Sequence, residues 1–474
     1  MTDPRDDLDA WLEARVHPLP PPPGTFELIR RRARQRKVRR AAMAAAGAAA
    51  AITLIAAVPT LIIPRLQPGS GQGQNTAATG QTQPASTGHG SATPSTAAST
   101  ATPVVTQPPV PPNFAATSVT FIGTDTGWVL GQAGIPGNCP IVKQDCTSIA
   151  RTDDGGATWY GSPAPVTTGP EGATGVSQIR FLDRDNGWAF GPELFATHDG
   201  GQTWTHVSTG GMRVTALETR GNRAFAVLAQ CTGTGSDFDA DCTSFAVSSA
   251  PASSNTWVPV AGATAAVSPG AAASSVSLLL TGTSGYLLTP SGDLLSGPVS
   301  GQGAWQPLTT PAASAQSASP STSPSTSTSQ CAPGSASPDG QPATGMLAAT
   351  NASGLVLLCT GQAADGSQVK TVYTSSDSGT TWHLGGTAPA AGTATSVAGT
   401  PSGTLVVATS LGLEISTDGG ATWTAADTAV PPGGFAFVGM TTSLQGVAVP
   451  ADPHQYAVWF TMDGGQNWQA SPIK

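Results

Sequence analysis

Three aspartates at alternate positions form the most metal-like cluster in the sequence. Asp237, Asp239 and Asp241 stand just before Cys242. Carboxylates with this spacing begin the loops that bind Ca²⁺. Such loops also need a glycine at the sixth position and a glutamate at the twelfth, where this chain has Cys242 and Ser248. A solvated acidic hairpin is therefore the favoured interpretation, and a calcium site is the alternative. No other cofactor is indicated.

The cysteines are the second set of residues with possible chemistry, and they report on the redox compartment. The sequence contains six of them: Cys139, Cys146, Cys231, Cys242, Cys331 and Cys359. An even number is typical of disulfides in an oxidising compartment. The short spacings favour pairing Cys139 with Cys146 and Cys231 with Cys242, which leaves Cys331 with Cys359. A zinc site is the alternative, but no CxxC spacing supports it.

A turn that ends in tryptophan recurs along the second part of the chain. Five full copies are TDDGGATW, THDGGQTW, SSDSGTTW, STDGGATW and TMDGGQNW. Their aspartates and tryptophans are Asp154 and Trp159, Asp199 and Trp204, Asp377 and Trp382, Asp418 and Trp423, and Asp463 and Trp468. Degenerate copies end at Trp257 and Trp305. Successive tryptophans are 45, 53, 48, 77, 41 and 45 residues apart, and the value of 77 falls to 45 without low-complexity residues 311–342. The sequence thus contains seven units.

A second element, a turn followed by a short apolar strand, precedes each tryptophan and also occurs seven times. TDTGWVLG, DRDNGWAFG and GTSGYLLT are examples. Each unit is therefore expected to form three or four strands in a meander. One such sheet cannot bury both faces, but seven around an axis can. The 57 Gly and 41 Pro residues exclude a coiled coil or helical bundle. The prediction is an all-β, seven-bladed β-propeller over residues 114–474.

The repeated turn resembles the Asp box, or bacterial neuraminidase repeat. The chain is similar over residues 114–474 to the Asp-box propellers, which include sialidases, sortilin-type receptors and photosystem II assembly factors. The resemblance implies that the box aspartates and tryptophans are structural and lie at the periphery of the propeller. It assigns no catalytic residue. The aspartates are expected to accept backbone N–H bonds, and the tryptophans to fill space between sheets.

A sialidase-like hydrolase is the least favoured function. The resemblance implies three arginines from different blades and a Tyr–Glu pair. The last four units contain no arginine, and the Phe-Arg-Ile-Pro signature is absent. The candidate tyrosines and glutamates are Tyr286, Tyr373, Tyr456, Glu193, Glu218 and Glu414, and no spacing pairs them. Trp128 and Trp188 are carbohydrate platforms in one interpretation and core residues in the favoured one.

A basic block and an uncharged stretch predict a membrane anchor. Residues 1–40 hold ten Arg or Lys against six Asp or Glu, and residues 41–63 contain no charge. A 23-residue helix spans about 35 Å, enough to cross a bilayer. The cationic flank is expected in the cytoplasm and the cysteines outside. This context favours a membrane flank over nucleic-acid binding for the basic block. A cleaved signal peptide is the alternative.

Residues 64–113 are poor in charge and rich in Gly, Ser, Thr, Pro and Gln, which predicts a disordered tether, and residues 311–342 form a similar insert. In the tail, residues 3–16 carry a short apolar stripe that could bind a cytoplasmic regulator such as a sigma factor. The resulting hypothesis is a single-pass bacterial plasma-membrane protein. Its propeller binds or scaffolds an envelope protein or glycan outside the cell. A transmembrane signal transducer and a glycoside hydrolase are the alternatives.

Overall fold

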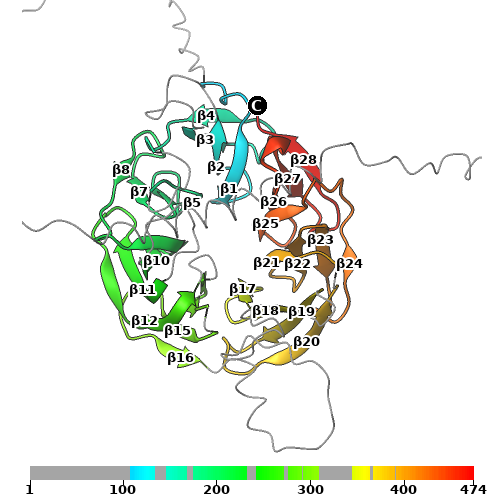
Figure 1. Ribbon diagram of the computed structural model, residues 1–474. Helices are drawn as coiled ribbons and strands as arrows, with labels where there is room; N and C mark the ends of the chain where they lie inside the picture. The colour runs from blue at the N-terminus through cyan, green and yellow to red at the C-terminus, as the bar shows by residue number, and fades with distance from the viewer. Residues whose placement is uncertain are drawn as a thin grey trace, which may run out of the picture. The chain divides into compact units, whose positions relative to one another are not determined.

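The computed structural model describes residues 107–133, 146–167, 174–231, 242–271, 276–290, 292–308, 344–362, 367–389 and 391–474. These residues form seven four-stranded antiparallel sheets, and each sheet uses four strands that are consecutive in the sequence. A short 3-10 helix, η2 (Pro453–Gln455), is the one helix among them. Figure 1 shows the sheets arranged in a ring, with β1, β5, β17, β21 and β25 innermost and β4, β8, β12, β16, β20, β24 and β28 outermost.

The sheets are numbered as blades in chain order. Blade 1 is β1 (Ala115–Phe121), β2 (Gly127–Ala133), β3 (Cys146–Thr152) and β4 (Tyr160–Ser162). Blade 2 is β5 (Gln178–Phe181), β6 (Gly187–Phe190), β7 (Leu194–Thr197) and β8 (Thr205–His206). Blade 3 is β9 (Arg213–Arg220), β10 (Arg223–Cys231), β11 (Cys242–Pro251) and β12 (Val258–Ala271). Blade 4 is β13 (Ser277–Thr281), β14 (Ser284–Leu288), β15 (Leu294–Pro298) and β16 (Gln306–Leu308).

The remaining blades follow the same order. Blade 5 is β17 (Thr344–Ala349), β18 (Leu355–Gln362), β19 (Gln368–Ser375) and β20 (His383–Ala388). Blade 6 is β21 (Ala394–Gly399), β22 (Leu405–Thr409), β23 (Gly412–Ser416) and β24 (Thr424–Ala425). Blade 7 is β25 (Phe435–Met440), β26 (Gly446–Pro450), β27 (Ala457–Thr461) and β28 (Gln469–Pro472). In every blade, the first strand is innermost in the order of hydrogen bonding and the fourth is outermost.

The second strand of each blade explains why the sequence showed continuous apolar runs rather than alternation. All residues of β6, β22 and β26 are buried, because neighbouring blades cover both faces of the sheet. A short apolar run bounded by turn residues is the pattern expected for such a strand. The glycines that begin β2 and β6 also permit close packing, since a Cβ on Gly127 or Gly187 would lie 2.6 or 2.5 Å from a phenylalanine ring.

The hydrophobic core is divided into seven clusters, one at each interface between neighbouring blades. Each cluster contains one of the seven repeat tryptophans or packs against it. From the interface of blades 1 and 2 round to that of blades 7 and 1, they are Trp204, Trp257, Trp305, Trp382, Trp423, Trp468 and Trp159. Every interface between blades is therefore a core of apolar side chains to which one repeat tryptophan adds aromatic surface.

Blades 7 and 1 close the ring without exchanging a strand, because each sheet is built from consecutive strands. Side chains form this seam. Trp159 Nε1 donates to Ser471 Oγ at 3.3 Å, and Ser471 Oγ donates to the carbonyl of Gly156 at 2.6 Å. The ring of Phe460 contacts Phe121 edge-on at 5.7 Å between centroids. Gln445 Nε2 also donates to the carbonyl of Thr124 at 2.7 Å.

The predicted all-β fold and the count of seven blades are confirmed, and each blade has four strands. Among the described residues, no helix is long and apolar enough to span a membrane. The predicted anchor at 41–63, the tail stripe at 3–16 and the insert at 311–342 lie outside the described residues.

Candidate functional site: the central cavity

The innermost strands of all seven blades line one central cavity of about 1010 Å³. The volume lies at the upper end of the range for ligand sites, about 300–1,000 Å³. Because every blade contributes one strand, equivalent positions on the seven strands form rings around this cavity.

One such ring is defined by the register of the first two strands. Its members all pair with the first large apolar residue of their blade's second strand, such as Trp128 or Trp188. They are Thr120, Arg180, Glu218, Leu279, Ala349, Gly399 and Gly439. Blades 2 and 3 therefore supply two charged side chains to this ring, whereas blades 5, 6 and 7 supply small residues.

The two charged members of the ring form an ion pair across the interface of blades 2 and 3. Arg180 Nε lies 3.0 Å from Glu218 Oε1, and Arg180 Nη1 donates to the carbonyl of Ile179 at 2.9 Å. The side chains are 18% and 33% exposed, so both reach the cavity. Arg213, buried at the start of β9, is the other charged residue of the described lining. The charged lining residues thus come from blades 2 and 3.

The wall made by blades 4 to 7 is largely apolar. It includes Leu279, Leu280, Met346, Phe437 and Met440, all of which are half-buried. Two hydroxyls on this wall are used within the ring. Thr395 Oγ1 donates to the carbonyl of Phe435 at 2.6 Å, and Ser396 Oγ donates to the carbonyl of Val438 at 3.3 Å. The cavity therefore presents a charged pair on one side and apolar surface on the other.

The five box turns predicted from the sequence lie between the third and fourth strands of their blades, away from this cavity. Their aspartates are Asp154, Asp199, Asp377, Asp418 and Asp463. In each turn, one carboxylate oxygen accepts the backbone N–H of the residue four positions later, at 2.8–3.0 Å. The other oxygen accepts the side chain of that residue at 2.5–2.6 Å. These bonds hold the turn and leave the carboxylates no evident role in chemistry.

The same bonds lower the pKa of several box aspartates. For Asp199, Asp377 and Asp418 the pKa falls to about 2, first because of the hydroxyl of the threonine four residues later. The glycine two residues after the aspartate has a positive φ in every box, from 86 to 98°. Its N–H donates at 2.8–2.9 Å to the hydroxyl two residues before the aspartate. A side chain at this glycine would strain the turn.

The predicted calcium ligands Asp237, Asp239 and Asp241 lie outside the described residues. Within the described part of the chain, no three His, Cys, Asp or Glu residues are placed to hold a metal ion.

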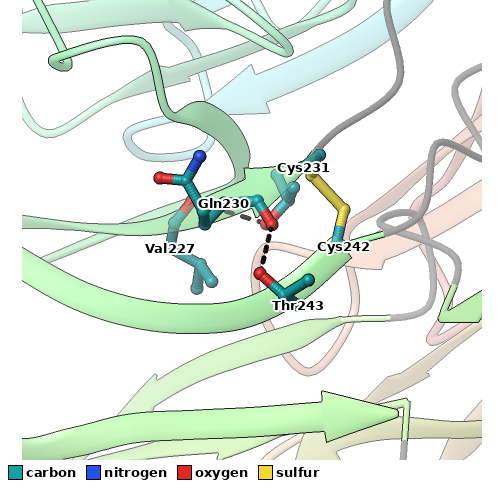
Figure 2. Close-up of a disulfide and its surroundings, with 6 residues drawn as sticks. Val227, Gln230, Cys231, Cys242 and Thr243 are labelled. Atoms are coloured by element: carbon teal, nitrogen blue, oxygen red, sulfur yellow. Dashed lines mark hydrogen bonds between the residues drawn. A yellow bond between two sulfur atoms is a disulfide. The ribbon is translucent and has the colours of Figure 1, made fainter. Parts of the chain in front are cut away.

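One predicted disulfide, Cys231–Cys242, is present and joins the ends of β10 and β11 (Figure 2). Beside it, Thr243 Oγ1 donates to the carbonyl of Gln230 at 3.3 Å. Cys359 is also in a disulfide. Its expected partner Cys331 lies outside the described residues, as does Cys139, so the other two pairings stay predictions.

Among the described residues, no hydrogen bond joins one of the tyrosines considered for hydrolysis to one of the glutamates. Glu218 is bonded to Arg180, and Glu193 Oε1 lies 3.6 Å from His206 Nε2. Tyr286 is fully buried and donates to the carbonyl of Ser378. Trp128 and Trp188 are also fully buried, and so belong to the core.

Two further polar sites were not predicted from the sequence. Lys370 is 1% exposed, and its Nζ donates to the carbonyls of Pro389 at 2.5 Å and Ala391 at 3.1 Å. Burial lowers the pKa of Lys370, and the negative charge of Glu414 partly offsets this. Burial likewise raises the pKa of Glu414. In the sequence, the only feature that could have indicated this site is a lysine between apolar residues of a predicted strand.

The second site is a network at the box turn of blade 1. Asp153 accepts from Tyr160 and from Arg151 Nη2 at 3.0 Å, and Arg184 of blade 2 lies 3.8 Å away. Burial and the bond to Asp153 raise the pKa of Tyr160 to about 12. Arg151 also lies 5.0 Å from the centroid of the Trp128 ring. The network ties blade 1 to blade 2.

A ring of four-stranded sheets around a lined cavity defines the chain as a seven-bladed β-propeller. No protein-family model and no curated protein matches it. The structure of YCF48 bound to D1 peptide is 18% identical, covers 76% of this chain and 93% of the other, and has a TM-score of 0.44. Sqt1 of Saccharomyces cerevisiae is 9% identical, with 76% and 86% covered and a TM-score of 0.44.

The xyloglucanase of family GH74 from Xanthomonas campestris is 11% identical, with 75% and 72% covered and a TM-score of 0.27. Likenesses this distant carry no information about function, which therefore has to be argued from the residues of the chain itself.

Proposed function

We propose that this chain is a membrane-anchored, extracytoplasmic propeller that binds or scaffolds an envelope protein or glycan, and that the ligand occupies the central cavity. The observation that supports this most directly is the cavity itself. It has the size of a ligand site, a mostly apolar wall and one ion pair, Arg180–Glu218, facing into it. Apolar lining with a few polar groups that converge is typical of binding sites.

The lining favours binding over glycoside hydrolysis. Most glycosidases use two carboxyl groups on either side of the bond that breaks. Among the described residues that line the cavity, Glu218 is the one carboxylate. Its Oε1 lies 3.0 Å from Arg180 Nε, and within the described lining no second carboxyl group is present to complete a catalytic pair.

The finer parts of the proposal rest on the sequence. Membrane anchoring and an N-terminus in the cytoplasm are inferred from the basic block and uncharged residues 41–63. An extracytoplasmic propeller is consistent with the Cys231–Cys242 disulfide, since such bonds persist in oxidising compartments. We infer a relationship to the Asp-box propellers because the five box turns all have the same pattern of hydrogen bonds around their aspartates.

Capture of a ligand from cell-envelope extract tests the proposal. Full-length protein is immobilised, exposed to the extract and washed, and the bound material is identified by mass spectrometry. The Ala349→Leu variant narrows the cavity, because Ala349 belongs to the cavity ring. The matched control is Leu384→Ser, which changes an exposed side chain on the outermost strand of the same blade.

The expected result is a specific ligand that wild type and the control retain and the Ala349→Leu variant loses. Equal capture by all three proteins would show that the cavity is not the binding site. Thermal unfolding of each variant is followed in parallel to establish that it is folded.

A further inference from the structure

We propose that the ligand in the central cavity is an extended, uncharged segment of a partner protein chain. In this proposal Arg180 and Glu218 hydrogen-bond the backbone C=O and N–H of one of its residues, and its apolar side chains pack on the wall of blades 4 to 7. The inference rests on the proposed function and names the ligand class for the same cavity.

The ion pair leaves donors on Arg180 and an acceptor on Glu218 for a ligand. Arg180 uses Nε for Glu218 and one N–H of Nη1 for the carbonyl of Ile179, and Glu218 uses Oε1 for Arg180. None of the hydrogen bonds among the described residues uses Arg180 Nη2 or Glu218 Oε2. A guanidinium nitrogen donates and a carboxylate oxygen accepts. The pair therefore complements one acceptor and one donor that point the same way, as the C=O and N–H of one residue do in an extended chain.

The charge of the pair favours a neutral ligand group. The positive and negative charges of the pair lie 3.0 Å apart and largely cancel at a ligand, and Arg213, the third charged residue of the described lining, is only 8% exposed. A charged ligand group would be attracted by one partner and repelled by the other, and it would lose its hydration on entering the cavity. A peptide group loses less hydration, and the pair replaces its bonds to water.

Opposite the pair, the ring consists of residues with a small side chain or none. By order around the ring, blades 5 to 7 face blades 2 and 3, and their members are Ala349, Gly399 and Gly439. A Cβ on Gly399 would lie 2.7 Å from the carbonyl oxygen of Ala349, and one on Gly439 would lie 3.0 Å from the ring of Phe437, so neighbouring groups fill these positions. The space for a ligand is the central cavity of about 1010 Å³ itself, in which a ligand chain can lie while the N–H and C=O of one of its residues reach the pair.

The chemistry of the opposite wall favours a peptide over a sugar. A saccharide carries many hydroxyls, and each buried hydroxyl without a partner costs free energy. Leu279, Met346 and Met440 offer no hydrogen bonds to a hydroxyl, and the hydroxyls of Thr395 and Ser396 already donate between blades. The other hydroxyls of this wall belong to Ser277 and Thr441, which are fewer than the many hydroxyls of a saccharide. Apolar side chains of a peptide gain from burial against the same surface.

The cavity has the length of a short peptide segment. On β9 its lining runs from Arg213 to Thr219, which spans about 20 Å at the rise of a β-strand. An extended chain advances about 3.3–3.6 Å per residue, so about six residues fit within this length.

Selection from a random library of heptapeptides, acetylated and amidated to remove terminal charges, tests the inference. The probe is applied to the immobilised full-length protein, and bound sequences are read by mass spectrometry. The expected sequences are apolar and lack Asp, Glu, Lys and Arg at their central positions. Binding of one selected peptide should weaken about tenfold or more when its central peptide nitrogen is methylated, because the donor to Glu218 is lost.

Variants of the protein provide the second measurement. Glu218→Gln and Arg180→Met should each weaken the selected peptide about tenfold, and the loss on methylation should shrink in Glu218→Gln. Ala349→Leu should abolish binding, whereas the peripheral Leu384→Ser should leave it within about twofold.

The outcomes separate this inference from the proposed function. Charged central residues in the selected peptides, or no selected peptides, would overturn the inference. The inference would also be overturned if the wild-type protein bound neutral oligosaccharides and the Ala349→Leu variant did not. In each of these cases the proposed function stands if the Ala349→Leu variant still loses the captured envelope ligand, and it fails if that capture is unchanged.

Discussion

Removing the tryptophan at the seam between blades 7 and 1 should open the ring. Trp159 is 7% exposed, packs in the cluster of this interface and donates to Ser471. Truncating a buried tryptophan to alanine costs about 3–5 kcal/mol, of which the lost hydrogen bond accounts for about 1 kcal/mol. This is a large fraction of a total stability of about 5–15 kcal/mol. Trp159→Ala should therefore lower the urea midpoint clearly, and Trp159→Phe should lower it less.

The part of the protein that opens should differ between Trp159→Ala and a variant that lacks a tryptophan elsewhere in the ring. Trp305 is 1% exposed and fills the interface of blades 3 and 4, where the chain runs directly from one blade to the next. No connecting segment joins blades 7 and 1, so their separation needs only the loss of side-chain contacts. Local opening should therefore be easiest at the seam.

Hydrogen exchange followed by mass spectrometry measures this difference. Trp159→Ala should speed exchange in β1 and β28, with little change in blades 3 to 5. Trp305→Ala should leave β1 and β28 close to wild type under the same native conditions. Identical exchange patterns in the two variants, or a loss of stability below about 1 kcal/mol for Trp159→Ala, would refute the reasoning.

Three further predictions concern acid, a buried amine and the disulfide. Bonds to Asp377 and Asp418 lower their pKa from 3.8 to about 2, so these bonds stabilise the fold above the ordinary pKa and are lost as the pH falls towards 2. The melting temperature of wild type should therefore exceed that of the double Asp→Asn variant at about pH 5, and the difference should vanish near pH 2. Lys370→Met leaves two carbonyls without their donor, and urea unfolding should show a loss of about 1–3 kcal/mol that Lys370→Arg partly restores. Replacing Cys231 and Cys242 by serine should cost about 3 kcal/mol, as expected for a bond across 11 residues, and a reducing agent should then have less effect on the urea midpoint than in wild type.

The architecture could be predicted because the repeat carries the packing that closes the ring. Trp257 and Trp305 end copies that have lost the box aspartate, yet each lies at the interface predicted by its spacing. The tryptophan fills the space between sheets whatever holds its turn. In the degenerate copies, serine hydroxyls take over locally, since Ser254 Oγ accepts the N–H of Thr256 and Ser300 Oγ that of Gln302.

The cavity could not be predicted in the same way. Arg180 and Glu218 are 38 residues apart and meet only because equivalent positions of neighbouring blades face one axis. Periodicity shows which residues share a face of a strand, but it does not show which of two faces borders the cavity. The small members of the ring, such as Gly399, resemble turn or spacer residues in the sequence. Aligning every first strand by its pairing with the second would have placed all of them in one layer.

The most direct test of the central claim is hydrogen exchange in full-length protein with and without its captured envelope ligand. The account predicts slower exchange in the innermost strands, above all β5 and β9, which carry Arg180 and Glu218, while β8, β12 and β20 at the rim do not change. Slower exchange confined to the outermost strands or to the box turns would contradict it.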